Sequence, residues 1–151
     1  EGGVVAEGDV ELVVAPKNEE TRRIPISAGQ SPRLVPQPLM LWGDAPAFLV
    51  QRSGGDTAVL ELYSFWNGEL VELKPESDVF LGSGVVDHEG EMTEQRTWIT
   101  PEGLMFTSVL LDWETRRHQL WQWDPNAGET ISTIDLGEAC IDWETGKYGR
   151  C

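Results

Sequence analysis

The strongest structural signal in this sequence is the pair Asn67-Gly68, which separates two runs of alternating apolar and polar residues. The first run spans residues 57–66 and the second spans residues 69–74. In the type I′ turn, one of the common two-residue hairpin turns, both residues take a positive φ, which asparagine and glycine tolerate better than other residues. Because side chains alternate between the two faces of a strand, this pattern predicts an antiparallel β-hairpin.

Similar runs recur along the chain and predict an all-β fold of antiparallel hairpins and meanders. Further strands are expected over residues 9–14, 22–26, 47–52, 96–100, 104–113, 117–123 and 129–136. No stretch of a dozen residues keeps a helical period free of Gly, Pro and β-branched runs, so no helix is expected. With 151 residues, the chain is expected to form one domain over residues 1–151.

Two segments are expected to lie outside the regular strands. Residues 31–38 contain three prolines, and we interpret them as a connector or an edge segment, because proline cannot donate a hydrogen bond inside a sheet. Residues 75–95 are acidic and broken by glycines, which predicts a long surface loop.

One turn sequence recurs, since the tetrapeptide DWET begins at Asp112 and again at Asp142. An aspartate at the start of a turn accepts a backbone N–H group. Gly146, and Gly128 in the related turn before it, can supply the left-handed conformation that returns the chain. The first DWET copy has Arg116 in the glycine position, so its turn is expected to differ.

Residues 120–124, 127–129 and 142–147 resemble blades of bacterial extracytoplasmic β-propeller repeats, such as the FG-GAP and quinoprotein-like families. The resemblance covers about half the chain and implies strands that end in closely spaced aromatic residues before a tight turn. A propeller ring typically needs about four to eight blades. The chain has residues for about two or three, so the hairpins are expected to be propeller-blade-like or to form a small sandwich or barrel.

The acidic composition limits the partners. Lys and Arg number 11 against 26 Asp and Glu, which gives a formal charge of −15. Such a charge repels nucleic acid and anionic lipid, so no nucleic-acid partner is expected. No apolar run approaches the ~20 residues of a membrane span, and Glu1-Gly2-Gly3 does not begin a signal peptide. We expect the partner to be another envelope protein with a basic face, or a neutral glycan.

Cys140 and Cys151 are the two cysteines of the chain. The midpoint between them falls near Thr145-Gly146, so a hairpin is expected to place them opposite each other as a disulfide. Disulfides persist in oxidising compartments, which favours an extracytoplasmic location. Two unpaired thiols and half of a metal site are the alternatives, and the absence of a second cysteine pair disfavours zinc.

His88 lies among Asp87, Glu89, Glu91 and Glu94. One imidazole among carboxylates is the composition of a divalent-cation site or an acid–base pair. A solvated acidic surface is the simpler interpretation, and we expect it to contact a basic partner. The second histidine, at position 118, is expected to be exposed at the start of a strand. No metal and no cofactor is expected.

The chain contains 7 Trp against 4 Phe and 2 Tyr, so aromatic residues are a second source of candidate binding sites. Trp121 and Trp123 are two positions apart and are expected to point to the same face of one strand. We interpret them first as packing residues. If their rings were exposed they would stack on sugar rings, so they are also candidate binding residues.

The sequence contains no nucleophile elbow, P-loop or dinucleotide-binding motif. It therefore predicts a non-catalytic binding domain of a bacterial envelope or secreted protein, located outside the cytoplasm or anchored there as lipoproteins are. A carbohydrate-binding module with Trp faces is the alternative. A hydrolase with an acidic pair is the third hypothesis. It ranks last because, among 26 acidic residues, pairs of carboxylates occur often by chance.

Overall fold

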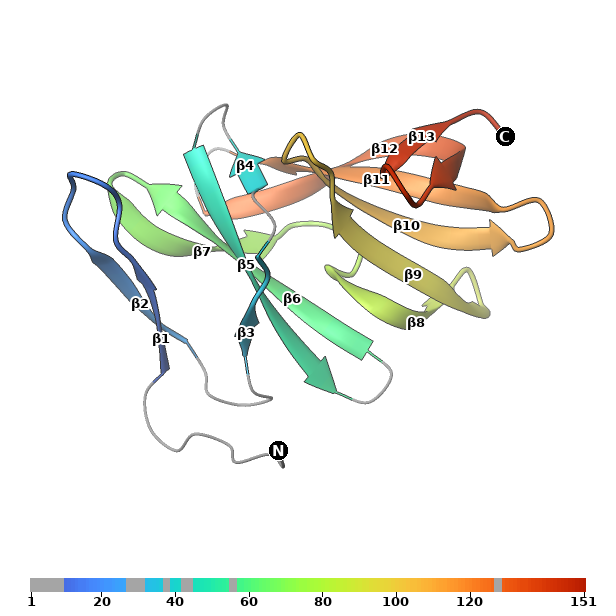
Figure 1. Ribbon diagram of the computed structural model, residues 1–151. Helices are drawn as coiled ribbons and strands as arrows, with labels where there is room; N and C mark the ends of the chain where they lie inside the picture. Colours follow the sequence, from blue (N-terminus) through green and yellow to red (C-terminus); the bar gives the residue numbers. More distant parts are fainter. Residues whose placement is uncertain (1–9, 27–31, 37–38, 42–44, 55–56, 127–128) are drawn as a thin grey trace.

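The computed structural model describes residues 10–26, 32–36, 39–41, 45–54, 57–126 and 129–151. In this part of the chain every regular element is a strand, as the alternating patterns predict (Figure 1). The strands are β1 (Val10–Val14), β2 (Arg22–Ile26), β3 (Arg33–Leu34), β4 (Leu39–Leu41), β5 (Ala45–Gly54), β6 (Thr57–Trp66), β7 (Glu69–Pro75), β8 (Gly82–His88), β9 (Glu91–Ile99), β10 (Met105–Asp112), β11 (Arg117–Pro125), β12 (Thr130–Asp142) and β13 (Lys147–Gly149).

Seven of these strands close into a barrel. The ring runs β6–β7–β12–β11–β10–β9–β8 and returns to β6. Its neighbours are antiparallel except β7 and β12, which pair in parallel through Lys74 with Thr130 and Pro75 with Ile131. β5 extends the sheet beyond β6, and β3 and β4 pair with β5. The expected all-β class is confirmed, and the chain adopts the small barrel among the arrangements that the sequence left open.

The turn between β6 and β7 is the one that the sequence predicts. Asn67 and Gly68 have φ values of 51° and 78°, and Trp66 and Glu69 form the closing pair of the hairpin. Positive φ at both central residues is the geometry that matches the right-handed twist of two joined strands. The local sequence therefore determines the register of this hairpin.

The expectation of a loop over residues 75–95 is wrong for the second half of this segment, because β8 and the first part of β9 form a hairpin there. The last pair of this hairpin is His88 and Glu91, and the two turn residues between them have φ values of 52° and 88°. Glycines and acidic residues interrupt the apolar alternation in this segment, which is why its strands were not expected. The acidic residues therefore lie on a defined hairpin.

The main apolar core fills the inside of the barrel. Side chains from β4, β5, β6, β7, β10, β11 and β12 meet there with one residue from the connection between β7 and β8. Its buried members are Leu39, Ala47, Leu49, Leu60, Leu62, Leu73, Leu81, Met105, Trp123 and Ile131. Burial of apolar area at about 25 cal/mol per Å² makes this cluster the main source of stability.

Two further apolar clusters lie on the outer face of the barrel, each under a hairpin. The β1–β2 hairpin covers the outer side of β5, β6 and β7 (Figure 1). Its cluster contains Leu12, Val50, Tyr63 and Leu70. The C-terminal hairpin of β12 and β13 lies over a third cluster, which contains Phe106, Leu120 and Ala139 with Trp98 and Ile141 beside them. Both faces of the sheet are therefore partly covered.

A chain of buried and partly buried hydrogen bonds crosses four strands of the barrel. The indole N–H of Trp123 donates to Thr107 Oγ1 over 2.8 Å. The Thr107 and Thr97 hydroxyl oxygens are 2.7 Å apart, and Thr97 donates to the Gly82 carbonyl over 2.5 Å. Because the Thr97 hydrogen is used on that carbonyl, Thr107 must be the donor to Thr97. In each of these three hydrogen bonds the donor therefore lies on the strand nearer to β11 and the acceptor on the strand nearer to β8.

The disulfide between Cys140 and Cys151 is present, with Cα atoms 4.9 Å apart. The expected register is wrong by two residues, since Gly149 is the partner that lies opposite Cys140. The turn occupies the four residues between Asp142 and Lys147, which form the closing pair. The bridge therefore holds the chain just beyond the end of β13.

The two DWET turns differ in part, as expected: a register shift precedes Asp112 in the first, and in the second the Gly146 N–H donates to the Asp142 carbonyl over 2.7 Å. The backbone conformation at the fifth position is nevertheless shared. Arg116 takes a φ of 62°, close to the 73° of Gly146. In both turns the first aspartate, Asp112 or Asp142, accepts the N–H of the glutamate two residues on over 2.9 Å. The left-handed conformation is accessible to arginine at a cost of about 1–2 kcal/mol. The related turn at Gly128 lies outside the described residues.

The proline-rich segment supplies an edge of the sheet, as one of its two interpretations expected. β3 lies within residues 31–38 and stands at the end of the strand order, paired with β5. Residues 31, 37 and 38 lie outside the described part of the chain.

No helix in the described part is long and apolar enough to cross a membrane.

Candidate functional site

A groove opens where the pairing between β9 and β10 ends. The last pair of this ladder is Gln95 with Val109, although β9 starts at Glu91 and β10 continues to Asp112. The Thr93 hydroxyl donates to the Leu110 carbonyl over 2.6 Å and bridges the two strands there. The groove has a volume of 410 Å³ and is lined by His88, Glu89, Glu91, Met92, Thr93, Leu110, Leu111 and Trp113.

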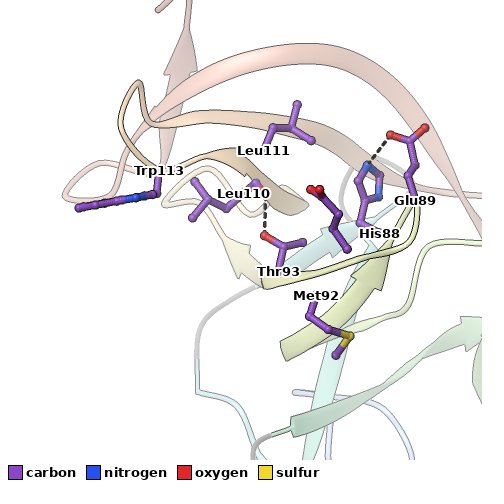
Figure 2. Close-up of a pocket in the computed structure, with 8 residues that line it drawn as sticks. His88, Glu89, Met92, Thr93, Leu110, Leu111 and Trp113 are labelled. Carbon is purple, nitrogen blue, oxygen red and sulfur yellow. Dashed lines mark hydrogen bonds and ion pairs between the residues drawn. The ribbon is translucent and has the colours of Figure 1, made fainter.

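Two apolar side chains of this groove project into solvent. Trp113 is 72% exposed and Met92 is 68% exposed. Figure 2 shows Trp113 at one end of the groove and the pair His88–Glu89 at the other. Single exposed apolar residues are common, but a large aromatic residue and a methionine beside one hollow are typical of interaction sites. Methionine adapts its shape to different partners because its chain is flexible and polarizable.

The β8–β9 hairpin surrounds the groove with negative charge. Asp87, Glu89, Glu91 and Glu94 are all exposed, and no Lys or Arg in the described residues lies within 4.0 Å of their carboxylates. His88 Nε2 lies 3.5 Å from Glu89 Oε2, which is an ion pair when the imidazole is protonated. Apart from the contact between His88 and Glu89, these carboxylates have no ion-pair partner in the described part of the chain.

The Asp87 side chain also shapes the tip of the hairpin. Its Oδ1 accepts the N–H of Gly90 over 3.0 Å, which is the bond that an aspartate makes at the start of a turn. Asp87 therefore has a structural role as well as a charge. Glu89 and Glu91 have no such bond in the described residues, so they are the carboxylates that are available to a partner.

The two tryptophans that the sequence singled out have different positions. Both point to the inner face of β11, as expected, and Trp121 pairs with Thr107 of β10. Trp121 is half-buried, and its ring is T-shaped against His88 with centroids 6.2 Å apart. Trp123 is 2% exposed inside the barrel. Trp123 is therefore a packing residue, which corrects its interpretation as a candidate binding residue. The Trp121 ring packs against His88.

The second histidine is not exposed, which corrects the expectation for position 118. His118 is 6% exposed, and its Nδ1–H donates to the Arg116 carbonyl over 2.9 Å. Burial lowers the pKa of His118 below its ordinary value, and the hydrogen bond to Arg116 opposes this shift. The ring lies 5.7 Å from Trp143, on the outer face of the barrel under the C-terminal hairpin.

Sequence reasoning brought Asp87, His88, Glu89 and Glu91 into one site, and the structure places them together at one hairpin tip. It missed Trp113, which follows the aspartate of the first DWET turn and is exposed. The missed signal was the repetition of DWET, which placed a tryptophan in two turns.

The described residues contain no group of three or more His, Cys, Asp or Glu side chains that could hold a metal ion. The arrangement offers apolar contact, negative charge and backbone groups at the ends of two strands. These are the means of binding, and they require no reaction step. Comparison of the chain with protein-family models, curated proteins and solved structures finds no match.

Proposed function

We propose that this chain is a non-catalytic binding domain that holds a partner protein with a basic surface at the β9–β10 groove. The observation that carries the proposal is the combination of exposed Trp113 and Met92 with the exposed carboxylates of Glu89 and Glu91 around one hollow. Apolar contact provides affinity, and the carboxylates select a cationic partner.

The charge of the whole chain supports the same partner class. A net charge of −15 attracts a basic surface over long distances and accelerates the encounter. The same charge opposes association of two copies of the chain. The disulfide between Cys140 and Cys151 supports an extracytoplasmic location, either secreted or anchored at the cell envelope.

A neutral glycan is the second candidate, and the open face of Trp113 favours it, because an exposed indole can stack on a sugar ring. The two hypotheses differ in their dependence on salt. Attraction between exposed charges is screened over about 8 Å at physiological ionic strength, whereas stacking on a neutral sugar is nearly independent of salt.

The proposal is tested by calorimetric titration of the chain with a blocked oligo-lysine peptide at about 50 mM and about 500 mM salt. The test variant combines Asp87→Asn, Glu89→Gln and Glu91→Gln, and Asn keeps the acceptor that Gly90 needs. The matched control combines Glu69→Gln, Glu102→Gln and Glu129→Gln, which changes the net charge equally at exposed sites elsewhere.

Binding should weaken about tenfold in the test variant, since each exposed charge contributes about 0.5 kcal/mol. It should weaken far less in the control variant, and high salt should reduce the difference between them. Equal losses in the two variants would mean that only the overall charge matters, and would remove the groove from the proposal. Binding of neutral oligosaccharides without any of the peptide would favour the glycan.

A further inference from the structure

The chain contains an internal comparison for Trp113, because Trp143 occupies the same position in a turn of the same length and the same DWET sequence. Both turns enclose four residues, with closing pairs Asp112–Arg117 and Asp142–Lys147. Both have the same aspartate bond of 2.9 Å and a left-handed residue before the returning strand. The two indoles therefore differ chiefly in the side chains that pack against their rings.

Trp143 shows which groups suit a tryptophan at this place. The guanidinium carbon of Arg96 lies 4.0 Å from the Trp143 ring centroid, which is a close cation–π contact. The Trp98 ring packs against another side of Trp143, T-shaped at 4.9 Å. Trp143 is half-buried in this way.

Trp113 has none of these neighbours. It is 72% exposed, and among the described residues no aromatic ring and no cationic group packs against it. The turn that carries it is nevertheless well supported, because Cys140 Sγ of the disulfide lies 3.4 Å from the Arg116 carbonyl. A supported turn thus presents an indole whose face is open.

We infer that Trp113 recognises an arginine guanidinium on the partner, with the carboxylates of Glu89 and Glu91 in the same groove positioned for basic side chains around it. This inference rests on the proposed function and names the partner as an arginine-bearing segment. A guanidinium is planar and weakly hydrated, so it can lie flat on an indole while its N–H edge still bonds to carboxylates. A lysine ammonium is a strongly hydrated point charge and stacks less well.

A second copy of the chain is a poorer occupant, because two chains of charge −15 repel each other. A neutral sugar would use the Trp113 face but leave the carboxylates of the groove without counter-charge. An arginine-bearing segment satisfies both the aromatic face and the carboxylates, and it is the contact that Trp143 already makes within the chain.

The test compares blocked oligo-arginine and oligo-lysine peptides of equal length, titrated against the full chain with tryptophan emission and calorimetry as readouts. The wild-type chain should bind oligo-arginine about threefold to fivefold more tightly than oligo-lysine, the preference expected of a partly exposed cation–π contact. Trp113→Leu keeps an apolar side chain but removes the ring, and should abolish the preference. Trp113→Phe should keep part of it. Near-UV circular dichroism checks that the fold is unchanged.

Equal affinity for the two peptides, unaltered by Trp113→Leu, would overturn the inference. If that binding still depended on Glu89 and Glu91, the proposed function would stand without an arginine preference. Failure of both peptides to bind would overturn the inference and the proposed function together. Sedimentation provides a further check, because self-association that disappears in Trp113→Leu would assign the indole to an interface between copies and contradict the inference.

Discussion

Replacing Thr107 by Val should destabilise the barrel far more than the similar size of the two side chains suggests. The hydroxyl of Thr107 accepts the indole N–H of Trp123 and donates to Thr97. Thr107 and Trp123 are buried, and Thr97 is half-buried. Valine has nearly the same shape but no hydroxyl. The indole N–H loses its acceptor and Thr97 loses its donor, and a buried unsatisfied group costs about 1–3 kcal/mol. We expect the free energy of unfolding to fall by about 2–3 kcal/mol.

The neighbouring residue provides the control. Ser108 is 1% exposed, and its hydroxyl has no hydrogen-bond partner in the described residues. Ser108→Ala removes a buried polar atom that no bond compensates, so it should leave stability unchanged or raise it by up to about 1 kcal/mol. The two substitutions each remove one hydroxyl from the same strand at equal depth, and differ in whether that hydroxyl is bonded.

Urea unfolding followed by far-UV circular dichroism measures both effects and extends to a double-mutant cycle. Trp123→Phe alone removes the N–H and some volume, and should cost about 2–4 kcal/mol. In combination with Thr107→Val the loss should be about 1–2 kcal/mol smaller than the sum, because the second change removes a donor that is already unsatisfied. Strict additivity, or equal costs for Thr107→Val and Ser108→Ala, would refute the hydrogen-bond chain as a source of stability.

Other predictions concern the C-terminal half. Reducing the Cys140–Cys151 bridge, whose sequence separation is 11, should cost about 3 kcal/mol and lower Tm by about 6–12 °C; a Tm that calorimetry finds unchanged would show that the hairpin unfolds separately. Arg116→Gly should stabilise the protein by up to about 1 kcal/mol, because glycine adopts the positive φ of this position without strain. Gly146→Arg should destabilise the protein, because a Cβ atom there would lie 3.1 Å from Trp98. Changes of the opposite sign in urea unfolding would contradict both predictions. Burial lowers the pKa of His118, so the unfolded chain binds its proton more tightly, and the free energy of unfolding should decrease as the pH falls below about 6.5. Between about pH 7.5 and 5.5 the wild type should lose more stability than His118→Gln. Equal pH dependence in the two proteins would exclude the effect.

The hairpins were predictable where the signal is local. Asn67-Gly68 needs no information from the rest of the chain, because its backbone preference alone selects the turn. β8 was not predictable in this way. A side chain at Gly82 would collide with the Ala58 carbonyl and the Phe80 ring, so glycine is required by the close approach of a neighbouring strand. A glycine that looks like a strand breaker in the sequence is here a requirement of packing.

The candidate site was predicted in part for the same reason. The acidic cluster around His88 is contiguous in the sequence, so it could be recognised, although the hairpin beneath it could not. Trp113 and Trp143 lie in identical DWET tetrapeptides, and tertiary structure decides their exposure, because Arg96 and Trp98 pack against Trp143. The position of Trp123 inside the barrel likewise depends on which face of the sheet the chain encloses.

The parallel seam between β7 and β12 has a consequence for the order of folding. It contains two residue pairs, fixed by the bonds from Lys74 N–H to the Glu129 carbonyl and from Glu76 N–H to the Ile131 carbonyl. Pro75 lies between these donors, where its missing N–H removes no bond from the seam. β7 must therefore wait, during synthesis or translocation, until more than fifty later residues have emerged before its edge is covered. Such distant pairing slows folding and leaves an open strand edge in the meantime, so the nascent barrel should be most prone to aggregate and most dependent on chaperones before residue 131 is available.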